Sequence, residues 1–77
     1  MKLFEVKPGM KCRVKALGPG MAALRRRLLD LGVLSGEPLL VIRKAPLGDP
    51  MEIEVKGTRI TLRRDEAQKI EVEVEYD

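Results

Sequence analysis

The chain has 77 residues, 35% of them charged, and a formal net charge of +3. A chain of this length forms one domain, here residues 1–77, and buries only about 60% of its unfolded surface, so it cannot enclose a large substrate cavity. It has no histidine and a single cysteine, Cys12. The usual acid–base residue of neutral pH and an internal disulfide are therefore both missing, which counts against an enzyme and against a secreted disulfide scaffold.

The chain shows no targeting or membrane segment. Its first residues, Met-Lys-Leu-Phe-Glu-Val, lack the apolar region of a secretory signal peptide. The longest apolar run, Leu39 to Ile42, is much too short to span a bilayer. A lone cysteine suits a reducing compartment. We therefore expect a cytoplasmic protein without a membrane span, and its charge-rich, asparagine-free composition is typical of heat-adapted proteins.

The first regular element is expected from residue 11 to residue 17. It follows a Lys7-Pro8-Gly9 turn, where proline presets φ and glycine accepts a positive φ. Apolar and basic residues then alternate, which is typical of a half-buried strand. The inward set is Cys12, Val14 and Ala16, and the outward set is Lys11, Arg13 and Lys15.

An amphipathic helix is predicted from about Gly20 to Leu31, after a Gly18-Pro19-Gly20 entry. Gly32 stands where a helix often ends in a left-handed residue, because glycine has no Cβ to clash there. At 3.6 residues per turn one apolar stripe faces the core. This stripe consists of Met21, Leu24, Leu28 and Leu31.

The second half of the chain predicts strands separated by short turns. Residues 38–44 form a nearly continuous apolar run, typical of a strand buried on both faces. Residues 45–50 contain two prolines and a glycine and predict a loop. A hairpin turning at Gly57-Thr58 should then join two alternating strands, 51–56 and 59–63. Its inward residues are Met51, Ile53, Val55, Ile60 and Leu62.

One helical turn and a final strand complete the pattern. Residues 64–69 predict a single turn, expected to be 3₁₀ and to start at Asp65, that places Ala67 and Ile70 in the core. Residues 70–76 alternate apolar residues with glutamate and predict the last strand.

The charges of the first and last strands are opposite. Basic residues line the outer face of the first strand, and Glu71, Glu73 and Glu75 line that of the last. Opposite charges across an antiparallel pair stabilise it by about 0.2–1 kcal/mol per pair, so we expect these strands to be neighbours. The predicted fold is mainly β: a small SH3-like barrel of about five antiparallel strands. One short α-helix lies between its first two strands, and a single-turn helix precedes the last.

Catalytic and metal chemistry find little support. The nucleophile candidates are Cys12, Ser35, Thr58, Thr61 and Tyr76. Cys12 lies on an inward face, and Ser35 has no base within reach in the sequence. Glu71, Glu73, Glu75 and Asp77 offer oxygen ligands, but alternate residues of a strand lie too far apart for a compact cage. We therefore expect no catalytic site, metal site or cofactor.

Binding to other macromolecules remains open. Leu29 falls outside the apolar stripe, between Arg25 and Arg26, and is either an ordinary exposed leucine or part of a contact surface. The run Arg25-Arg26-Arg27 could contact phosphates or a protein, or be a solvated face in which Arg26 pairs with Asp30. Phe4 and Tyr76 are the only aromatic residues. This scarcity counts against a polyproline groove and against stacking of nucleic-acid bases.

Four segments together resemble the FeoA family. They are residues 28–37 with a Leu-Gly-x-x-x-Gly turn, 45–50 with a Pro-x-Gly-Asp-Pro loop, 57–63, and 66–72 with Glu-Ala-x-x-Ile-x-Val. Each motif alone is weak, but their order and spacing are specific, and the resemblance covers essentially the whole chain. It implies an SH3-like fold similar to the C-terminal domains of iron-dependent repressors. It also implies a small cytosolic accessory protein of ferrous iron uptake that acts on FeoB, a membrane transporter with a cytosolic GTPase domain.

The resemblance transfers no catalytic residue and implies an adaptor. The helix flank and the proline loop are the candidate contacts with the transporter's GTPase region, although the loop could equally be a structural hairpin. The candidate contact residues are Arg25, Arg26, Leu29, Pro46, Leu47, Gly48, Asp49 and Pro50. The expected structural turn residues are Gly32, Gly36 and Gly57. Two alternatives stay open: a small-barrel nucleic-acid-binding protein, which is less favoured, and a detached repressor-type domain that senses iron.

Overall fold

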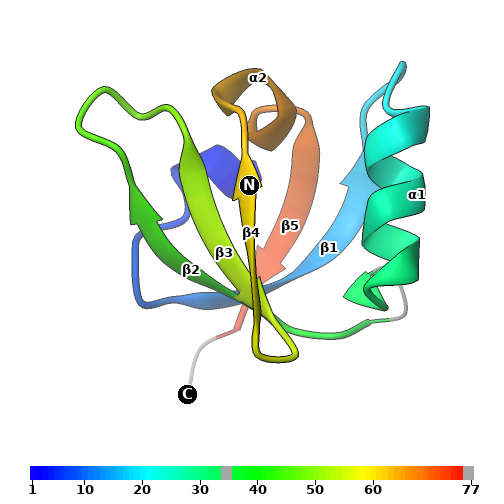
Figure 1. The fold of residues 1–77 in the computed structure, drawn as a ribbon, viewed down its shortest axis with the longest axis horizontal. Coiled ribbons are helices and arrows are strands. Elements are labelled where there is room, and N and C mark those ends of the chain that lie inside the picture. The colour runs from blue at the N-terminus through cyan, green and yellow to red at the C-terminus, as the bar shows by residue number, and fades with distance from the viewer. Residues whose placement is uncertain (34–35, 76–77) are drawn as a thin grey trace.

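The computed structural model describes residues 1–33 and 36–75. The elements are η1 (Leu3–Glu5), β1 (Lys11–Leu17), α1 (Ala22–Asp30), β2 (Leu39–Lys44), β3 (Met51–Val55), β4 (Thr58–Leu62), α2 (Arg64–Ala67) and β5 (Ile70–Val74). The five strands form one curled antiparallel sheet in the order β4-β3-β2-β1-β5 (Figure 1). The predicted mainly β, SH3-like fold is confirmed. In the described part of the chain, no helix has the length and apolar character needed to cross a membrane.

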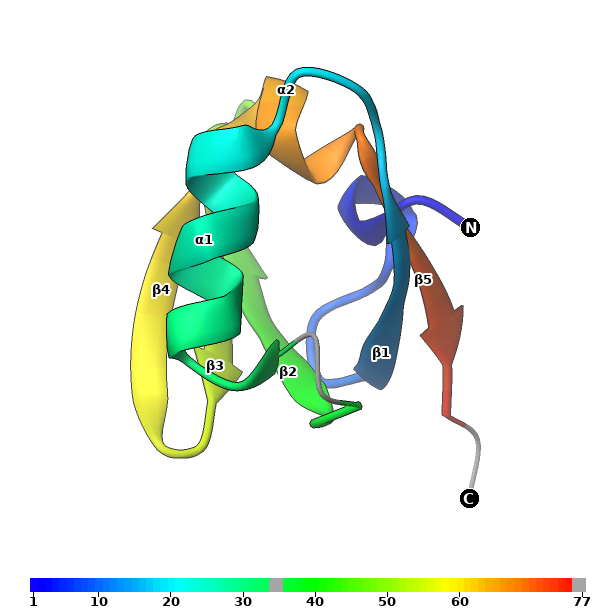
Figure 2. The same cartoon turned by 90° about the vertical axis from the view of Figure 1, so that its right-hand side faces the viewer.

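The predicted pairing of the first and last strands is confirmed. β1 pairs with β5 over most of its length and with β2 at its start. β4 and β5 are the edge strands of the sheet, and the short α2 connects them (Figure 2). α1 lies beside β4, where Arg27 Nη2 donates to the carbonyl oxygen of Thr61 at 3.5 Å. The helix thereby covers the side of the core that the sheet leaves open.

The outward charges pair less regularly than expected. Arg13 forms an ion pair with Glu75 across the two strands. Glu71 is bound instead by the α-ammonium group of Met1 at 3.3 Å and by Lys2 Nζ at 3.5 Å. The hydrogen bond from that ammonium group, with help from Lys2, lowers the pKa of the Glu71 carboxyl. Opposite charges therefore hold β5 from both sides, by β1 and by the N-terminus.

Two burial predictions are wrong. Ala16 is exposed, because the β1–β5 register shifts between Val14 and Ala16 and a bulge interrupts the alternation of β1. β2 is not buried on both faces. Leu39 and Val41 are buried. Leu40 and Ile42 are only half-buried, because their side chains face the outside of the curled sheet.

α2 also differs from its prediction. It is a turn of α-helix rather than 3₁₀, and it starts after Arg63 rather than at Asp65. Arg63 is extended, and its backbone N–H donates to Glu66 Oε1 at 2.9 Å, which satisfies a donor that the helix start leaves free. Ala67 and Ile70 are buried as predicted.

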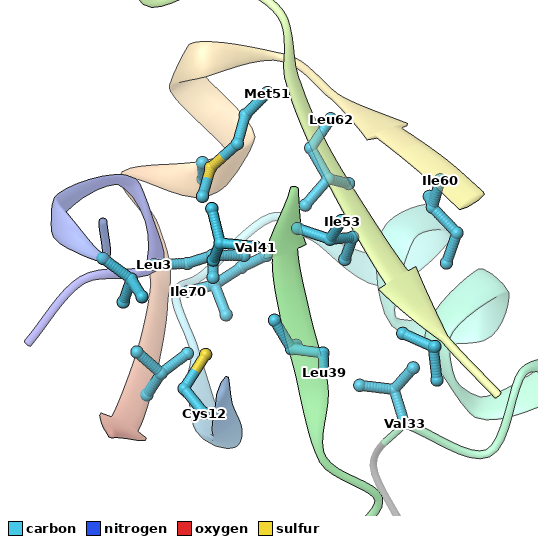
Figure 3. Close-up of a cluster of buried hydrophobic side chains, with 14 of the residues drawn as sticks. Leu3, Cys12, Val33, Leu39, Val41, Met51, Ile53, Ile60, Leu62 and Ile70 are labelled. Atoms are coloured by element: carbon cyan, nitrogen blue, oxygen red, sulfur yellow. The ribbon is translucent and has the colours of Figure 1, made fainter. Parts of the chain in front are cut away.

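The core draws side chains from every strand and from α1. Leu24 and Leu28 of α1 are 5% and 1% exposed, and Met21 and Leu31 pack against them at the two ends of the predicted stripe. α1 itself is slightly shorter than predicted, since Met21 and Leu31 are its cap residues. Figure 3 shows the central cluster converging between the sheet and α1. Its labelled members are Leu3, Cys12, Val33, Leu39, Val41, Met51, Ile53, Ile60, Leu62 and Ile70. All five inward residues predicted for the hairpin are buried.

Leu28 and the exposed Leu29 provide a matched test of this packing. Leu28→Ala should lower the free energy of unfolding by about 2–5 kcal/mol, because it leaves a cavity in the core. Leu29→Ala should change it by less than about 0.5 kcal/mol, because the side chain is 51% exposed. Urea unfolding followed by circular dichroism measures both. Equal losses in the two variants would contradict the orientation of α1.

Candidate functional site

The two groups of candidate contact residues lie on different parts of the molecule. The loop 45–50 joins β2 to β3 at one end of the sheet, and α1 stands on the opposite side of the molecule (Figure 1). One small partner surface could not readily contact both. We therefore consider the helix flank and the loop separately.

The helix flank is open and has few internal contacts. Leu29 is 51% exposed, and Arg25 and Arg26 are exposed beside it. Both Arg26 and Asp30 are described, yet they form no ion pair within 4.0 Å. Long side chains of this kind lose rotamer entropy when a partner orders them. This flank would therefore pay an ordering cost on binding.

The loop 45–50 is closed by its own backbone. Gly48 N–H donates to the carbonyl oxygen of Ala45 at 2.7 Å, and Ala45 N–H donates to that of Pro50 at 2.9 Å. Gly48 has a φ of +81°, which a glycine adopts without strain. Leu47 lies at the tip of this turn and is 87% exposed. The backbone therefore holds a large apolar side chain out in solvent.

The Phe4 ring packs against the loop 45–50 at Gly48. A Cβ at Gly48 would lie 3.1 Å from Phe4 Cζ, so the ring packs directly against this glycine. Two cations lie over the same ring: Lys44 Nζ at 4.8 Å and the Arg64 guanidinium carbon at 5.1 Å from its centroid. Such cation–π contacts contribute about 0.5–1 kcal/mol each at exposed sites. The ring thus joins η1, the end of β2 and the start of α2 under the loop.

Asp49 has a structural partner. Its Oδ1 accepts a hydrogen bond from the backbone N–H of Arg64 at 3.1 Å, which ties the loop to the first turn of α2. A carboxylate there also suits the positive end of a helix. Asp49 is therefore held at the base of the loop.

The exposed Leu47 and the three side chains packed at the base of its loop form what we call the Leu47 surface: Phe4, Lys44, Leu47 and Arg64. It combines one exposed apolar side chain with two cations that lie over the ring supporting its loop. Sequence patterns predicted Leu47 as a contact residue but not the other three. The one available signal was that Phe4 is the single phenylalanine in a chain with 3% aromatic residues. The surface is suited to a partner with an apolar pocket bordered by acidic groups.

The candidate nucleophiles and metal ligands do not come together. Cys12 is fully buried, and burial, with a smaller contribution from the Glu75 charge, raises the pKa of its thiol to about 11. Thr58 and Thr61 are exposed on β4. Ser35, Tyr76 and Asp77 lie outside the described residues. Within residues 1–33 and 36–75, no three Cys, Asp or Glu side chains are grouped closely enough to hold a metal ion.

The buried thiol makes stability depend on pH. The folded state keeps the Cys12 proton up to a pKa of about 11, whereas an unperturbed thiol loses it at a pKa of 9.0. Between these values the folded state binds more protons, so the free energy of unfolding should fall as pH rises, by at most about 1.4 kcal/mol per pH unit. Urea unfolding at pH 8–11 tests this against Cys12→Ala, which should lack this component. Identical pH profiles would contradict the assignment.

Alanine substitutions at Gly48 and Gly9 distinguish the contribution of the Phe4 contact from that of backbone strain. Both glycines have positive φ, but a Cβ at Gly9 would meet nothing within 4 Å. Gly9→Ala should therefore cost only the strain of a left-handed alanine, about 1–2 kcal/mol. Gly48→Ala should cost more and shift the Phe4 ring resonances, because its methyl group meets that ring. Thermal unfolding and aromatic NMR spectra measure both effects. Equal costs with an unmoved Phe4 would show that the ring does not support the loop.

Comparison with known proteins identifies the family. The family model described as the FeoA domain matches residues 1–74. A curated relative from Porphyromonas gingivalis, named as a fusion of Fe(2+) transport protein A and the Fe(2+) transporter FeoB, is 34% identical over 74 residues. The match covers 96% of this chain, which spans only 9% of that relative's length.

Two solved structures extend the match to three dimensions. The FeoA protein of Chlorobium tepidum superposes with a TM-score of 0.85 at 46% identity, over 96% of this chain and 70% of the other. A zinc complex of FeoA from Stenotrophomonas maltophilia gives a TM-score of 0.76 at 33% identity, over 95% and 89%. That protein is described as an SH3 domain protein and a candidate activating factor of ferrous iron transport. The present chain belongs to the FeoA family.

Proposed function

We propose that this protein is a non-enzymatic, cytoplasmic accessory protein of ferrous iron uptake, and that it binds the cytosolic GTPase region of a FeoB-type transporter. The observation that carries the proposal is the Porphyromonas gingivalis relative, in which an FeoA-like part and FeoB share one polypeptide. Fusion keeps two modules at high effective concentration, which benefits modules that work by contact. The buried Cys12 and the ungrouped acidic residues of the described part agree with a binding role.

The Leu47 surface supplies the contact in this proposal. Its loop is already held by two internal hydrogen bonds, the Phe4 ring and the Asp49–Arg64 bond, so binding costs little conformational entropy. The exposed Leu47 can fill an apolar pocket, as a buried anchor does at the centre of many interfaces. Lys44 and Arg64 would favour an acidic border around that pocket. The helix flank lacks comparable internal support.

Leu47 and Leu29 allow the two surfaces to be compared directly. Leu47→Asp should weaken binding to the isolated cytosolic region of the transporter at least tenfold, or about 1.4 kcal/mol, because it places a carboxylate in the apolar contact. Leu29→Asp introduces the same charge on α1 and should leave the dissociation constant unchanged. Calorimetric titration at low salt, with GDP and with a GTP analogue, measures both.

The titrations distinguish a wrongly assigned contact surface from a wrong function. If Leu29→Asp weakens binding and Leu47→Asp does not, the contact lies on α1 and the Leu47 surface is wrongly assigned. If the unmodified protein does not bind in either nucleotide state, the adaptor function itself is contradicted.

A further inference from the structure

The outer side of β5 is only partly covered by the residues that the structure describes. Val72 N–H donates to the carbonyl oxygen of Met1 at 2.8 Å, and Lys2 forms a β-bridge with Glu71. The N-terminus therefore continues the sheet beside the first half of β5. Among the described residues, none pairs with the second half of β5 on this side, and that half lies at the outer edge of the sheet (Figure 2).

The backbone of Val74 points away from β1. Glu75 N–H donates to the carbonyl oxygen of Lys11 at 2.9 Å, towards the interior of the sheet, whereas Val72 N–H points outwards to Met1. Successive residues of a strand present their N–H and C=O groups to opposite sides, so Val74 shares the outward direction of Val72. Its N–H and C=O are thus placed to pair with a further strand.

A hollow of mixed lining, with four apolar and two charged residues, lies next to this edge. It has a volume of about 220 Å³ and is lined by Met1, Glu5, Val6, Lys7, Met10 and Val74. Val74 is on the same face of β5 as the buried Val72, so a strand added beside it would place an apolar side chain on the side of the hollow. The edge therefore offers backbone hydrogen bonds and a site for one side chain together.

The solvent-facing side chains of β5 determine which charge an added strand should carry. Glu73 is exposed and lies directly across from Arg13 of β1, but Arg13 forms its ion pair with Glu75, and Glu73 has no ion pair within 4.0 Å among the described residues. A residue directly across from Glu73 on an added strand would have its Cβ about 4.5–5.5 Å away, where a lysine or arginine is favoured. A second copy of β5 would instead bring glutamates towards glutamates, which is destabilising.

We propose that the free half of the β5 edge binds an extended partner segment in which basic and apolar residues alternate. The segment adds a strand beside Glu73 and Val74, in line with residues 1–3, and directs an apolar side chain to the hollow. This is recognition by strand addition, in which backbone hydrogen bonds supply affinity and side-chain positions supply specificity. The site is separate from the Leu47 surface, so its failure would leave the proposed function standing.

Two synthetic peptides of opposite charge test the proposal. The probes are acetylated, amidated Lys-Val-Lys-Val-Lys-Val and Glu-Val-Glu-Val-Glu-Val, each titrated into the ¹⁵N-labelled full chain. The basic peptide should shift the amide resonances of β5 and slow hydrogen exchange at Val74 at least tenfold. The acidic peptide should do neither. Absence of β5 shifts with millimolar basic peptide would overturn the proposal.

Two variants distinguish strand addition from simple charge attraction. Val74→Pro removes the outward N–H without removing a hydrogen bond to β1, and it should abolish peptide binding. Glu73→Gln changes an exposed side chain and places no like charge across from Arg13, so it should keep the fold and remove the preference for the basic peptide. Unchanged binding of the basic peptide to Val74→Pro would show charge attraction alone. An unchanged preference in Glu73→Gln would equally contradict the proposal, and this second test holds even if Val74→Pro does not fold.

Discussion

The structure depends on the double pairing of β1. This strand lies between β2 and β5 and thereby joins the first and last parts of the chain in one sheet. A chain of 77 residues has little surface to bury, so its core needs side chains from both ends of the sequence. Because β1 holds β5, the buried residues of β5 and α2 reach the same core as those of the β3–β4 hairpin (Figure 3).

The same pairing determines which parts of the molecule remain available to partners. With β1 in the interior, the β2–β3 loop projects at one end, and β5 becomes an edge strand (Figures 1 and 2). The loop is then fastened by groups distant in sequence: Phe4 near the N-terminus and Arg64 after β4. A loop fastened in this way presents a preformed apolar tip, and preorganisation lowers the entropic cost of a contact.

Local patterns predicted most of the fold, because most elements here follow them. The alternation of Met51, Ile53 and Val55 indicates one buried face whatever the strand pairs with, and it was correct. Helical periodicity likewise separated Leu28 from Leu29. Opposite charges correctly placed the first strand beside the last.

The failures have non-local causes. Ala16 was misplaced because a bulge in the pairing with β5 breaks the alternation, and nothing in the sequence of β1 alone marks it. The Phe4 ring meets Gly48, Lys44 and Arg64 only after the sheet has folded, so no spacing in the sequence could reveal the cluster. The candidate site was therefore half predicted: its loop by composition, and its supporting residues not at all.

In the proposed function, a preformed loop surface, rather than the basic helix, contacts the transporter. The most direct test is chemical-shift mapping of the ¹⁵N-labelled protein during titration with the unlabelled cytosolic GTPase region. The account predicts that the perturbed amides cluster at residues 44–50, Phe4 and Arg64, while those of Arg25, Arg26 and Leu29 stay unchanged. Perturbations confined to α1, with a silent loop, would contradict it.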